Sequence, residues 1–498
     1  MKTKLWPYTN LSSAEADLRV PRDEDELKQI FEEARAQQRK VALRGGGHSF
    51  DTQSLGNDIV VSMEQFKRID PVANDCVAVR GADTWGDILR SLQAQGRAPY
   101  VTVTTEHATA GGTLSGDCLS RFSTAWGKEG ERIRSFTIVT PTGTLDCKRP
   151  NADHDLELGE RVYLAAIGGL GYLGAVTDIT YDVLPVRPID GRIRVHTTAH
   201  KYATCVDLAR ELIERARQAQ ARPPDAHDPS KDDAVYTALS PEGCGTGDGL
   251  ILRSHFHDGG PGKSMLLFRP RFLLRIPLEW LLRWVWFNRR FWRFVIRWGF
   301  KRHHEYVDDL DGYTFFMDGN VRAKKVARFL RFRLKMIQQT FVVPIDTTSD
   351  AGWAKGEQDL VRWLRYAQRV LEPKNLTPTL LDVLFLPKDL PFRLSATADT
   401  AGFAVSYACE TNDKSVLKAA EEAFEELSDG LWEDFGGRVY LVKNVRVKPQ
   451  TLQAMYGAQA EEFFAVKAEV DPDGILCNEF LDRTFPHRRG KPAAAATR

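Results

Sequence analysis

Three consecutive glycines, Gly45, Gly46 and Gly47, stand between Arg44 and His48 and follow a short apolar run. Glycine tolerates positive φ, so successive backbone N–H groups of such a turn can point at one anion. An imidazole beside that nest can donate to a phosphate or attack an electrophile. The pattern predicts an anion-binding turn with a chemically useful histidine. An ordinary glycine-rich turn with a surface histidine is the simpler alternative.

A second group of small residues, 109–116, again gathers backbone donors at a turn ahead of an apolar helical start. Residues 169–174 spell GxGxxG, but a dinucleotide fingerprint must follow a strand and open a helix. Here residues 176–181 alternate like a strand. We therefore reject a nicotinamide-dinucleotide site at 169–174.

Other candidate motifs fail on spacing. Residues 262–264 resemble the end of a P-loop, but the first required glycine is replaced by His257. The histidines at 255, 257, 303 and 304 lack cysteine or carboxylate partners at metal-ligand spacing. There is no GxSxG elbow and no Cys/His nucleophile signature. The sequence predicts no metal site.

The composition is that of a multidomain globular protein. The chain has 498 residues, of which 43% are hydrophobic and 27% charged, enough for roughly two to four domains. Its 68 Lys and Arg balance 67 Asp and Glu, which argues against a general attraction to nucleic acid. The seven cysteines form no CxxC pair and predict free thiols in a reducing compartment. With no apolar leader or 18-residue apolar stretch, we expect a cytoplasmic protein.

One segment, 266–302, departs from this balance. Between Lys263 and Arg302 lie eleven Lys or Arg, one acid and five of the eleven tryptophans. On a helix the basic residues share one face and the apolar residues the other, as in interfacial helices on anionic lipid. The segment predicts peripheral contact with a membrane surface. A solvated cap helix and a nucleic-acid groove are the alternatives, and we expect no nucleic-acid partner.

The surrounding pattern predicts an α+β fold. The first half alternates predicted helices and strands up to a break at Pro185 and Pro188. The second half carries two long amphipathic helices and two apolar strands, which predict a sheet covered by helices. The predicted helices are 18–37, 85–95, 357–371 and 415–435, and the predicted strands are 41–44, 59–62, 76–79, 137–140, 144–147, 176–184, 379–386 and 403–409.

In their order and spacing, the two glycine turns, the hairpin and the turn at 168–177 resemble the FAD-binding domain of the vanillyl-alcohol-oxidase, or PCMH-type, flavoproteins. The resemblance implies a two-subdomain FAD-binding domain at 1–187, a cap domain that binds substrate at 188–437, a segment at 438–487 that returns to the FAD domain, and a disordered tail at 488–498. It also implies a set of FAD-binding residues: Arg44, Gly45, Gly46, Gly47, His48, Ser49, Phe50, Thr109, Ala110, Gly111, Gly112, Ser115, Gly116, Gly174, Val176 and Asn478.

The C-terminal half resembles the branch of that family with decaprenylphosphoryl-ribose oxidase and sterol Δ24-reductases. This likeness implies that Lys443 lies over the flavin and is catalytic, with Tyr456 as a second catalytic residue. A desolvated lysine can act as a base or hold the substrate oxygen. The chain departs from that branch at its active-site positions, which argues against the same phospho-ribose lipid as substrate. The departing residues are Leu119, Phe385, Ala404 and Ser406.

Many relatives with a histidine at the position of His48 carry FAD through that imidazole, so we expect a covalent flavin. The ribose-oxidase branch argues for a non-covalent one. The resulting function is an FAD-dependent oxidoreductase that takes hydride from a CH–OH or activated C–H of an amphipathic, lipid-linked or small-molecule substrate, with O₂ or a redox partner as electron acceptor. An FAD-dependent ene-reductase of an isoprenoid or sterol-like double bond and a non-catalytic flavin-binding protein are the alternatives.

Overall fold

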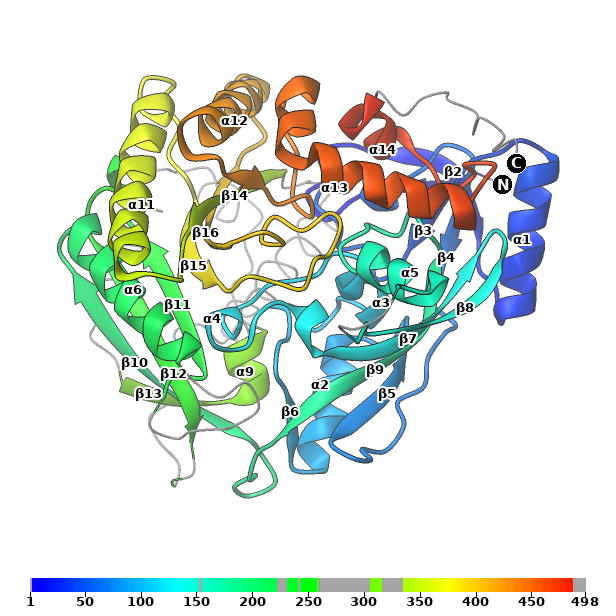
Figure 1. Cartoon of the computed structure of the whole chain (residues 1–498), viewed down its shortest axis with the longest axis horizontal. Coiled ribbons are helices and arrows are strands. Elements are labelled where there is room, and N and C mark those ends of the chain that lie inside the picture. The colour runs from blue at the N-terminus through cyan, green and yellow to red at the C-terminus, as the bar shows by residue number, and fades with distance from the viewer. Residues whose placement is uncertain are drawn as a thin grey trace, which may run out of the picture.

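The computed structural model describes residues 2–151, 155–221, 231–240, 242–257, 259, 305–315 and 335–486. The basic segment 266–302 and the tail 488–498, for which the sequence predicts membrane contact and disorder, lie outside the described residues. Within those ranges the strands form three sheets, arranged in two halves that meet along the middle of the molecule (Figure 1).

The first sheet opens the N-terminal half. Its order is β1 (Lys2–Leu5), β2 (Ala14–Arg19), β4 (Ile59–Ser62), β3 (Val41–Arg44), and the last two pairings are parallel. The helix predicted at 18–37 is α1 (Glu24–Ala36), whose Asp23 side chain accepts from the Glu26 N–H at 2.9 Å. Its apolar stripe, Leu27, Phe31 and Ala34, is buried. The strands predicted at 41–44 and 59–62 are confirmed with the same bounds.

The second sheet completes the N-terminal half and is antiparallel. Its order is β5 (Cys76–Arg80), β9 (Ala175–Pro185), β7 (Ile133–Thr140), β8 (Gly143–Lys148), and β6 (Arg97–Pro99) also pairs with β9. The GxGxxG run at 169–174 leads into β9, a strand, which confirms that it is no dinucleotide fingerprint. The helices of this half are η1 (Thr52–Ser54), α2 (Trp85–Ala94), α3 (Ala110–Leu114), α4 (Ser123–Trp126), η2 (Glu129–Arg132) and α5 (Leu158–Ala166).

The third sheet forms the other half and has eight strands. Its order is β13 (Glu305–Asp309), β10 (Arg194–Tyr202), β12 (Gly249–His257), β11 (Ala234–Leu239), β15 (Leu380–Leu386), β16 (Ala401–Glu410), β14 (Met336–Ile345), β17 (Arg438–Val439). The associated helices are α6 (Cys205–Gln220), η3 (Glu242–Gly245), α9 (Leu310–Thr314), α11 (Asp350–Leu371) and α12 (Lys414–Phe435). The expected α+β fold, with a sheet covered by helices, is confirmed.

Alternation along the central strands separates the two faces of this sheet. Phe341 of β14 packs against Trp363 of α11 and Phe424 of α12, and Phe385 of β15 packs against Trp353 of α11. The odd-numbered residues therefore face the helices, which leaves the even-numbered ones for the opposite face.

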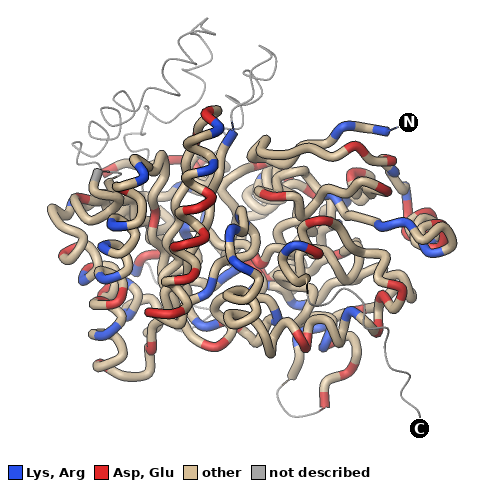
Figure 2. The backbone as a smooth tube through the Cα atoms, turned by 90° about the horizontal axis from the view of Figure 1, so that it is seen from above, with Lys and Arg blue, Asp and Glu red and all other residues tan. Residues whose placement is uncertain are grey.

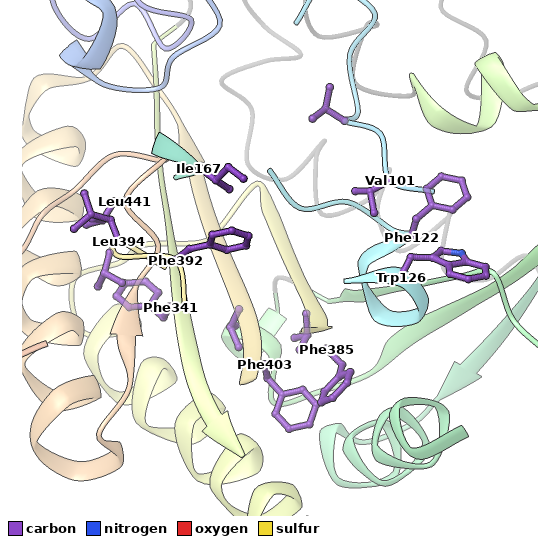
Figure 3. Close-up of a cluster of buried hydrophobic side chains, with 14 of the residues drawn as sticks. Val101, Phe122, Trp126, Ile167, Phe341, Phe385, Phe392, Leu394, Phe403 and Leu441 are labelled. Carbon is purple, nitrogen blue, oxygen red and sulfur yellow. The ribbon is translucent and has the colours of Figure 1, made fainter. Parts of the chain in front are cut away.

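A continuous apolar cluster joins the second and third sheets. Figure 3 shows Phe122 and Trp126 of the N-terminal half, and Phe385 and Phe403 of the eight-stranded sheet, as members of this cluster. The Thr124 hydroxyl donates to the Phe385 carbonyl at 3.1 Å across the same junction. The two halves are thus packed together, and their relative position is held by core burial.

The final part of the chain contacts both halves. β17 pairs with β14 of the eight-stranded sheet, and α13 (Pro449–Val470) and α14 (Glu479–Thr484) follow. Beyond α13, the Val41 N–H donates to the Ile475 carbonyl at 2.8 Å, alongside a parallel bridge to Leu476. The chain end thereby contacts the strand that leads into the first glycine turn.

Charged residues of both signs are interspersed over both halves, in keeping with the net charge of +1 (Figure 2). No helix within the described ranges is long and apolar enough to cross a membrane.

Candidate active site

A cavity of about 270 Å³ lies between the two halves. One water molecule needs only about 10–15 Å³ on the same scale, so the space suits a much larger ligand. Its walls come from both glycine turns, the turn before β9, the central strands of the eight-stranded sheet and the segment after β17.

The first glycine turn has no room for side chains. A Cβ on Gly45 would lie 2.3 Å from the Thr109 hydroxyl oxygen, and one on Gly46 would lie 2.4 Å from the His107 carbonyl oxygen. Gly47 has a φ of +72°, which disfavours other residues. The turn therefore packs directly on the second turn, and bare backbone forms this wall.

Arg44 lies under the same turn. Its guanidinium donates to the Trp6 carbonyl at 3.1 Å, and no salt bridge joins it to a carboxylate of the described residues. Burial lowers the pKa of Arg44, because the charged form loses hydration. A buried cation beneath a glycine nest fits an anionic ligand such as a diphosphate.

The second turn offers fewer free backbone N–H groups to a ligand than the sequence predicts. The N–H groups of Ala110 and Gly111 donate to the carbonyls of Asp83 and Gly81, each at 2.9 Å, and Ala110 is not on the cavity wall. The predicted residues that do line the wall are Thr109, Gly111, Gly112, Ser115, Gly116, Gly174 and Val176, together with Arg44, Gly45, Gly46, Gly47, His48, Ser49 and Phe50. Gly81, which the sequence reading missed, joins them.

His48 is half-buried on the cavity wall between two other rings. It stacks with Tyr8 at 5.5 Å and with His107 at 6.0 Å between ring centroids. Its imidazole is thus held beside the glycine turn by ring contacts from the N-terminal segment and from His107, just before the second turn.

A set of hydrogen bonds attaches Lys443 to the end of the first glycine turn. The Gln53 amide donates to the carbonyls of Leu441 and Lys443 at 3.2 and 3.1 Å. The Asn444 amide donates to the Phe50 carbonyl at 2.9 Å. Two chain segments almost four hundred residues apart in sequence therefore position one lysine.

An ion cluster supports this attachment. The buried carboxylate of Asp51 binds Arg446 at 2.7 Å and Arg483 at 3.0 Å. Burial alone would raise the pKa of Asp51, but the two guanidinium groups outweigh it and lower the pKa.

Lys443 itself reaches into the cavity, with its Nζ 3.7 Å from the centroid of the Phe50 ring. Burial lowers the pKa of Lys443, while Cys118 and Asp382 act in the opposite direction. The lysine therefore lies over Phe50 at the end of the first glycine turn, within electrostatic range of Asp382 on the eight-stranded sheet.

The sheet wall carries residues that the sequence reading missed. Leu380, Asp382 and Leu384 of β15 line the cavity, as even-numbered residues should. Asp382 pairs in register with Ser406 of β16, and the Tyr236 hydroxyl donates to its carboxylate at 3.3 Å. These residues come together only through strand pairing, so no sequence motif contains them.

Two predicted site residues lie elsewhere. The Tyr456 hydroxyl donates to the Val439 carbonyl at 2.8 Å, and the residue is buried away from the cavity wall, contrary to our expectation of a catalytic role. The Asn478 amide donates to the carbonyls of Thr52, Gln53 and Leu55, at 3.0, 2.8 and 2.8 Å. Asn478 is therefore a positioning residue for the segment after the glycine turn and does not line the cavity.

Of the four residues that differ from the ribose-oxidase branch, two line the cavity and two do not. Leu119 and Ser406 line the cavity, whereas Phe385 faces α11 and Ala404 is buried off the wall.

Comparison with known proteins identifies the family of the N-terminal domain. Residues 17–147, which contain both glycine turns, match the FAD binding domain family. Residues 17–147 are an FAD-binding domain of the PCMH type. The cofactor is FAD, and the buried Arg44 and the bare glycine wall fit its diphosphate.

Residues 404–484 match the D-arabinono-1,4-lactone oxidase family, and this stretch contains Lys443. Cytokinin dehydrogenase 1 of Oryza sativa subsp. japonica is 30% identical over 209 residues, which cover 40% of this chain and 36% of the relative. Cytokinin dehydrogenase 4 of the same organism is 29% identical over 34% of this chain and 32% of the relative. An uncharacterized oxidoreductase of the fasciation locus of Rhodococcoides fascians is 26% identical over 32% and 36%. The matched part spans about a third of the length of these curated relatives.

Proposed function

We propose that the protein is an FAD-dependent oxidoreductase that oxidises the CH–OH group of an amphipathic small molecule. The observation that carries this proposal is the position of Lys443. Its ammonium reaches into the cavity that the glycine turns of the FAD-binding domain enclose.

When bound, FAD supplies a two-electron acceptor that takes a hydride from a C–H bond. The protein must then orient that bond and handle the proton of the hydroxyl group. Lys443 donates a hydrogen bond to the substrate oxygen, and its backbone is held for that task by Gln53 and Asn444. Burial lowers the pKa of Lys443, and the Phe50 ring under the ammonium acts against that shift by favouring the charged, donating form.

The rest of the wall supports an amphipathic substrate. Leu119, Leu380, Leu384 and Val442 offer apolar surface around the polar end of the cavity. The match to D-arabinono-1,4-lactone oxidase covers Lys443, and that name specifies a hydroxylated substrate. The matches to cytokinin dehydrogenases cover 34% and 40% of the chain. We favour an alcohol over an amine because the lactone-oxidase match falls on the segment that carries Lys443.

Anaerobic reduction of the bound flavin tests this function. The holoprotein is mixed with sugar lactones, sugar alcohols, long-chain primary and secondary alcohols, a cytokinin and NADPH, and the visible flavin absorbance is followed. We expect bleaching by at least one alcohol or lactone. Bleaching by NADPH alone would indicate a reductase, bleaching by the cytokinin alone would indicate an amine dehydrogenase, and either result would overturn the proposal.

We also propose that His48 carries the flavin covalently. Its ring is fixed on the cavity wall between Tyr8 and His107, beside a turn without side chains. Acid-precipitated protein should stay yellow, and His48→Ala should release the flavin into the supernatant. His200→Ala, which removes an imidazole of β10 that does not line the cavity, should keep the flavin attached. Yellow supernatant from the unmodified protein would contradict the linkage.

A further inference from the structure

Asp382 is the acidic residue of β15, at the middle of the cavity-facing side of that strand. Leu380 and Leu384 flank it along the strand on the same face. Neither the glycine turns nor the Lys443 segment includes it, and the function proposed above does not use it.

Four groups from different parts of the chain affect the Asp382 carboxyl group. The Tyr236 hydroxyl of β11 donates to the carboxylate at 3.3 Å, and Ser406 of β16 is its partner in register. Arg121, stacked on Tyr236 at 4.6 Å, and Lys443 add positive charge. The carboxylate is therefore placed among donors and cations that stabilise its charged form.

Asp382 and Lys443 line the same cavity and lie within electrostatic range of one another. Each influences the pKa of the other, yet no salt bridge joins them in the described structure. Both side chains line one cavity, so a small group can lie between the amine and the carboxylate. A hydroxyl group suits that gap, because its oxygen accepts and its hydrogen donates.

We propose that Asp382 is the catalytic base for this site: its carboxylate accepts the hydroxyl proton of a substrate whose oxygen is held by Lys443. The inference rests on the proposed function. The O–H bond breaks and its proton forms the acid of Asp382, while the neighbouring carbon loses a hydride with two electrons to bound FAD. The electron pair of the O–H bond becomes the second bond of the carbonyl product, so atoms and electrons balance.

The protonation chemistry of the two residues agrees with this division of roles. Burial raises the pKa of Asp382 to about 6, against the opposing effects of Ser406, Lys443 and Tyr236. A carboxylate of that basicity is ionised at neutral pH and is a stronger base than an exposed one. The Lys443 ammonium above the Phe50 ring serves better as a donor than as a base.

The pH dependence of flavin reduction tests the base directly. Anaerobic rates are measured on the FAD-loaded protein with the alcohol or lactone that reduces it fastest, from about pH 5 to 9. The rate of the wild type should fall as the pH drops through about 6, where Asp382 takes up a proton. This loss of rate at low pH is the acid limb of the pH profile. Asp382→Asn should keep its FAD but react at least about a hundredfold more slowly, without that acid limb.

Two further variants make the result specific. Tyr236→Phe removes a donor from the carboxylate, so the acid limb should move to higher pH. Glu129→Gln alters another buried carboxyl, off the cavity wall, whose pKa burial raises to about 8, and it should leave the limb unchanged.

The outcomes separate this inference from the proposed function. No reduction by any alcohol or lactone would overturn both. Reduction of the wild type, with an unchanged acid limb in Asp382→Asn or in Tyr236→Phe, would overturn the role of Asp382 alone. If Asp382→Asn fails to fold, the position of the limb in Tyr236→Phe decides.

Discussion

The two walls of the cavity are built in different ways. The wall that the two glycine turns form is largely backbone, and a methyl group at Gly45 or Gly46 would collide with Thr109 or with the His107 carbonyl. The wall from the eight-stranded sheet is side chains, with Asp382, Tyr236 and Ser406 brought together by strand register. The first wall suits a ligand held through its diphosphate, and the second suits chemistry on a substrate.

This difference predicts which property each substitution affects. Changes to the backbone wall should reduce FAD binding, and changes to the side-chain wall should leave FAD bound and slow its reduction. Lys443 lies between the walls, because its backbone is attached to the glycine-turn side and its amine is within electrostatic range of Asp382 on the sheet.

The largest effect is expected for Lys443→Ala. The variant should retain FAD but reduce it at least about a hundredfold more slowly with substrate, because the lost hydrogen bond acts on the reacting oxygen. Stopped-flow absorbance and the flavin-to-protein ratio measure both properties. Lys448→Ala removes an exposed lysine paired with Asp429 nearby and should match the wild type. An undiminished rate in Lys443→Ala would assign the lysine a structural role only.

A smaller effect is expected for Gly46→Ala. The added methyl group would lie 2.4 Å from the His107 carbonyl oxygen, and backbone on both sides must shift. Such overpacking costs about 1–3 kcal/mol, so FAD affinity should fall about tenfold or more. Gly312→Ala, where a Cβ meets no atom within 4 Å, is the matched control. Equal FAD content in both variants would mean that the turn does not hold the cofactor.

The smallest effect concerns Glu129, a buried carboxyl outside the cavity wall. Burial raises its pKa from 4.5 to about 8, so in that interval the folded protein holds a proton that the unfolded chain releases. Stability should therefore fall as the pH rises from about 4.5 to 8. Glu129→Gln removes the titration, so the Tm of the variant relative to that of the wild type should rise between pH 5 and pH 8. A difference independent of pH would contradict the protonated native state.

The backbone wall could be predicted from the sequence because its requirements are local. Glycines between a strand and a turn identify the positions that must lack side chains, and the strands at 41–44 and 59–62 have the predicted bounds. The helix at 24–36 follows from its acidic first turn and apolar stripe. The resemblance also indicated Lys443, whose position in the cavity depends on a segment far along the chain.

The side-chain wall could not be predicted in this way. Asp382 lies in an apolar run that reads only as a buried strand, and its role depends on which strands lie beside it. Tyr456 was assigned to the site by resemblance, but its hydroxyl is used by the Val439 carbonyl. Asn478 likewise serves the backbone of residues 52–55. Topology, rather than local pattern, decides these positions.

The most direct measurement of the central claim is an isotope effect on flavin reduction. The holoprotein is reduced anaerobically by the fastest-reacting alcohol or lactone, carrying either hydrogen or deuterium on the carbinol carbon. The account predicts slower bleaching of the flavin by the deuterated compound, since the C–H bond breaks as hydride leaves for FAD. Bound FAD that no hydroxylated compound reduces, under conditions where NADPH does, would contradict it.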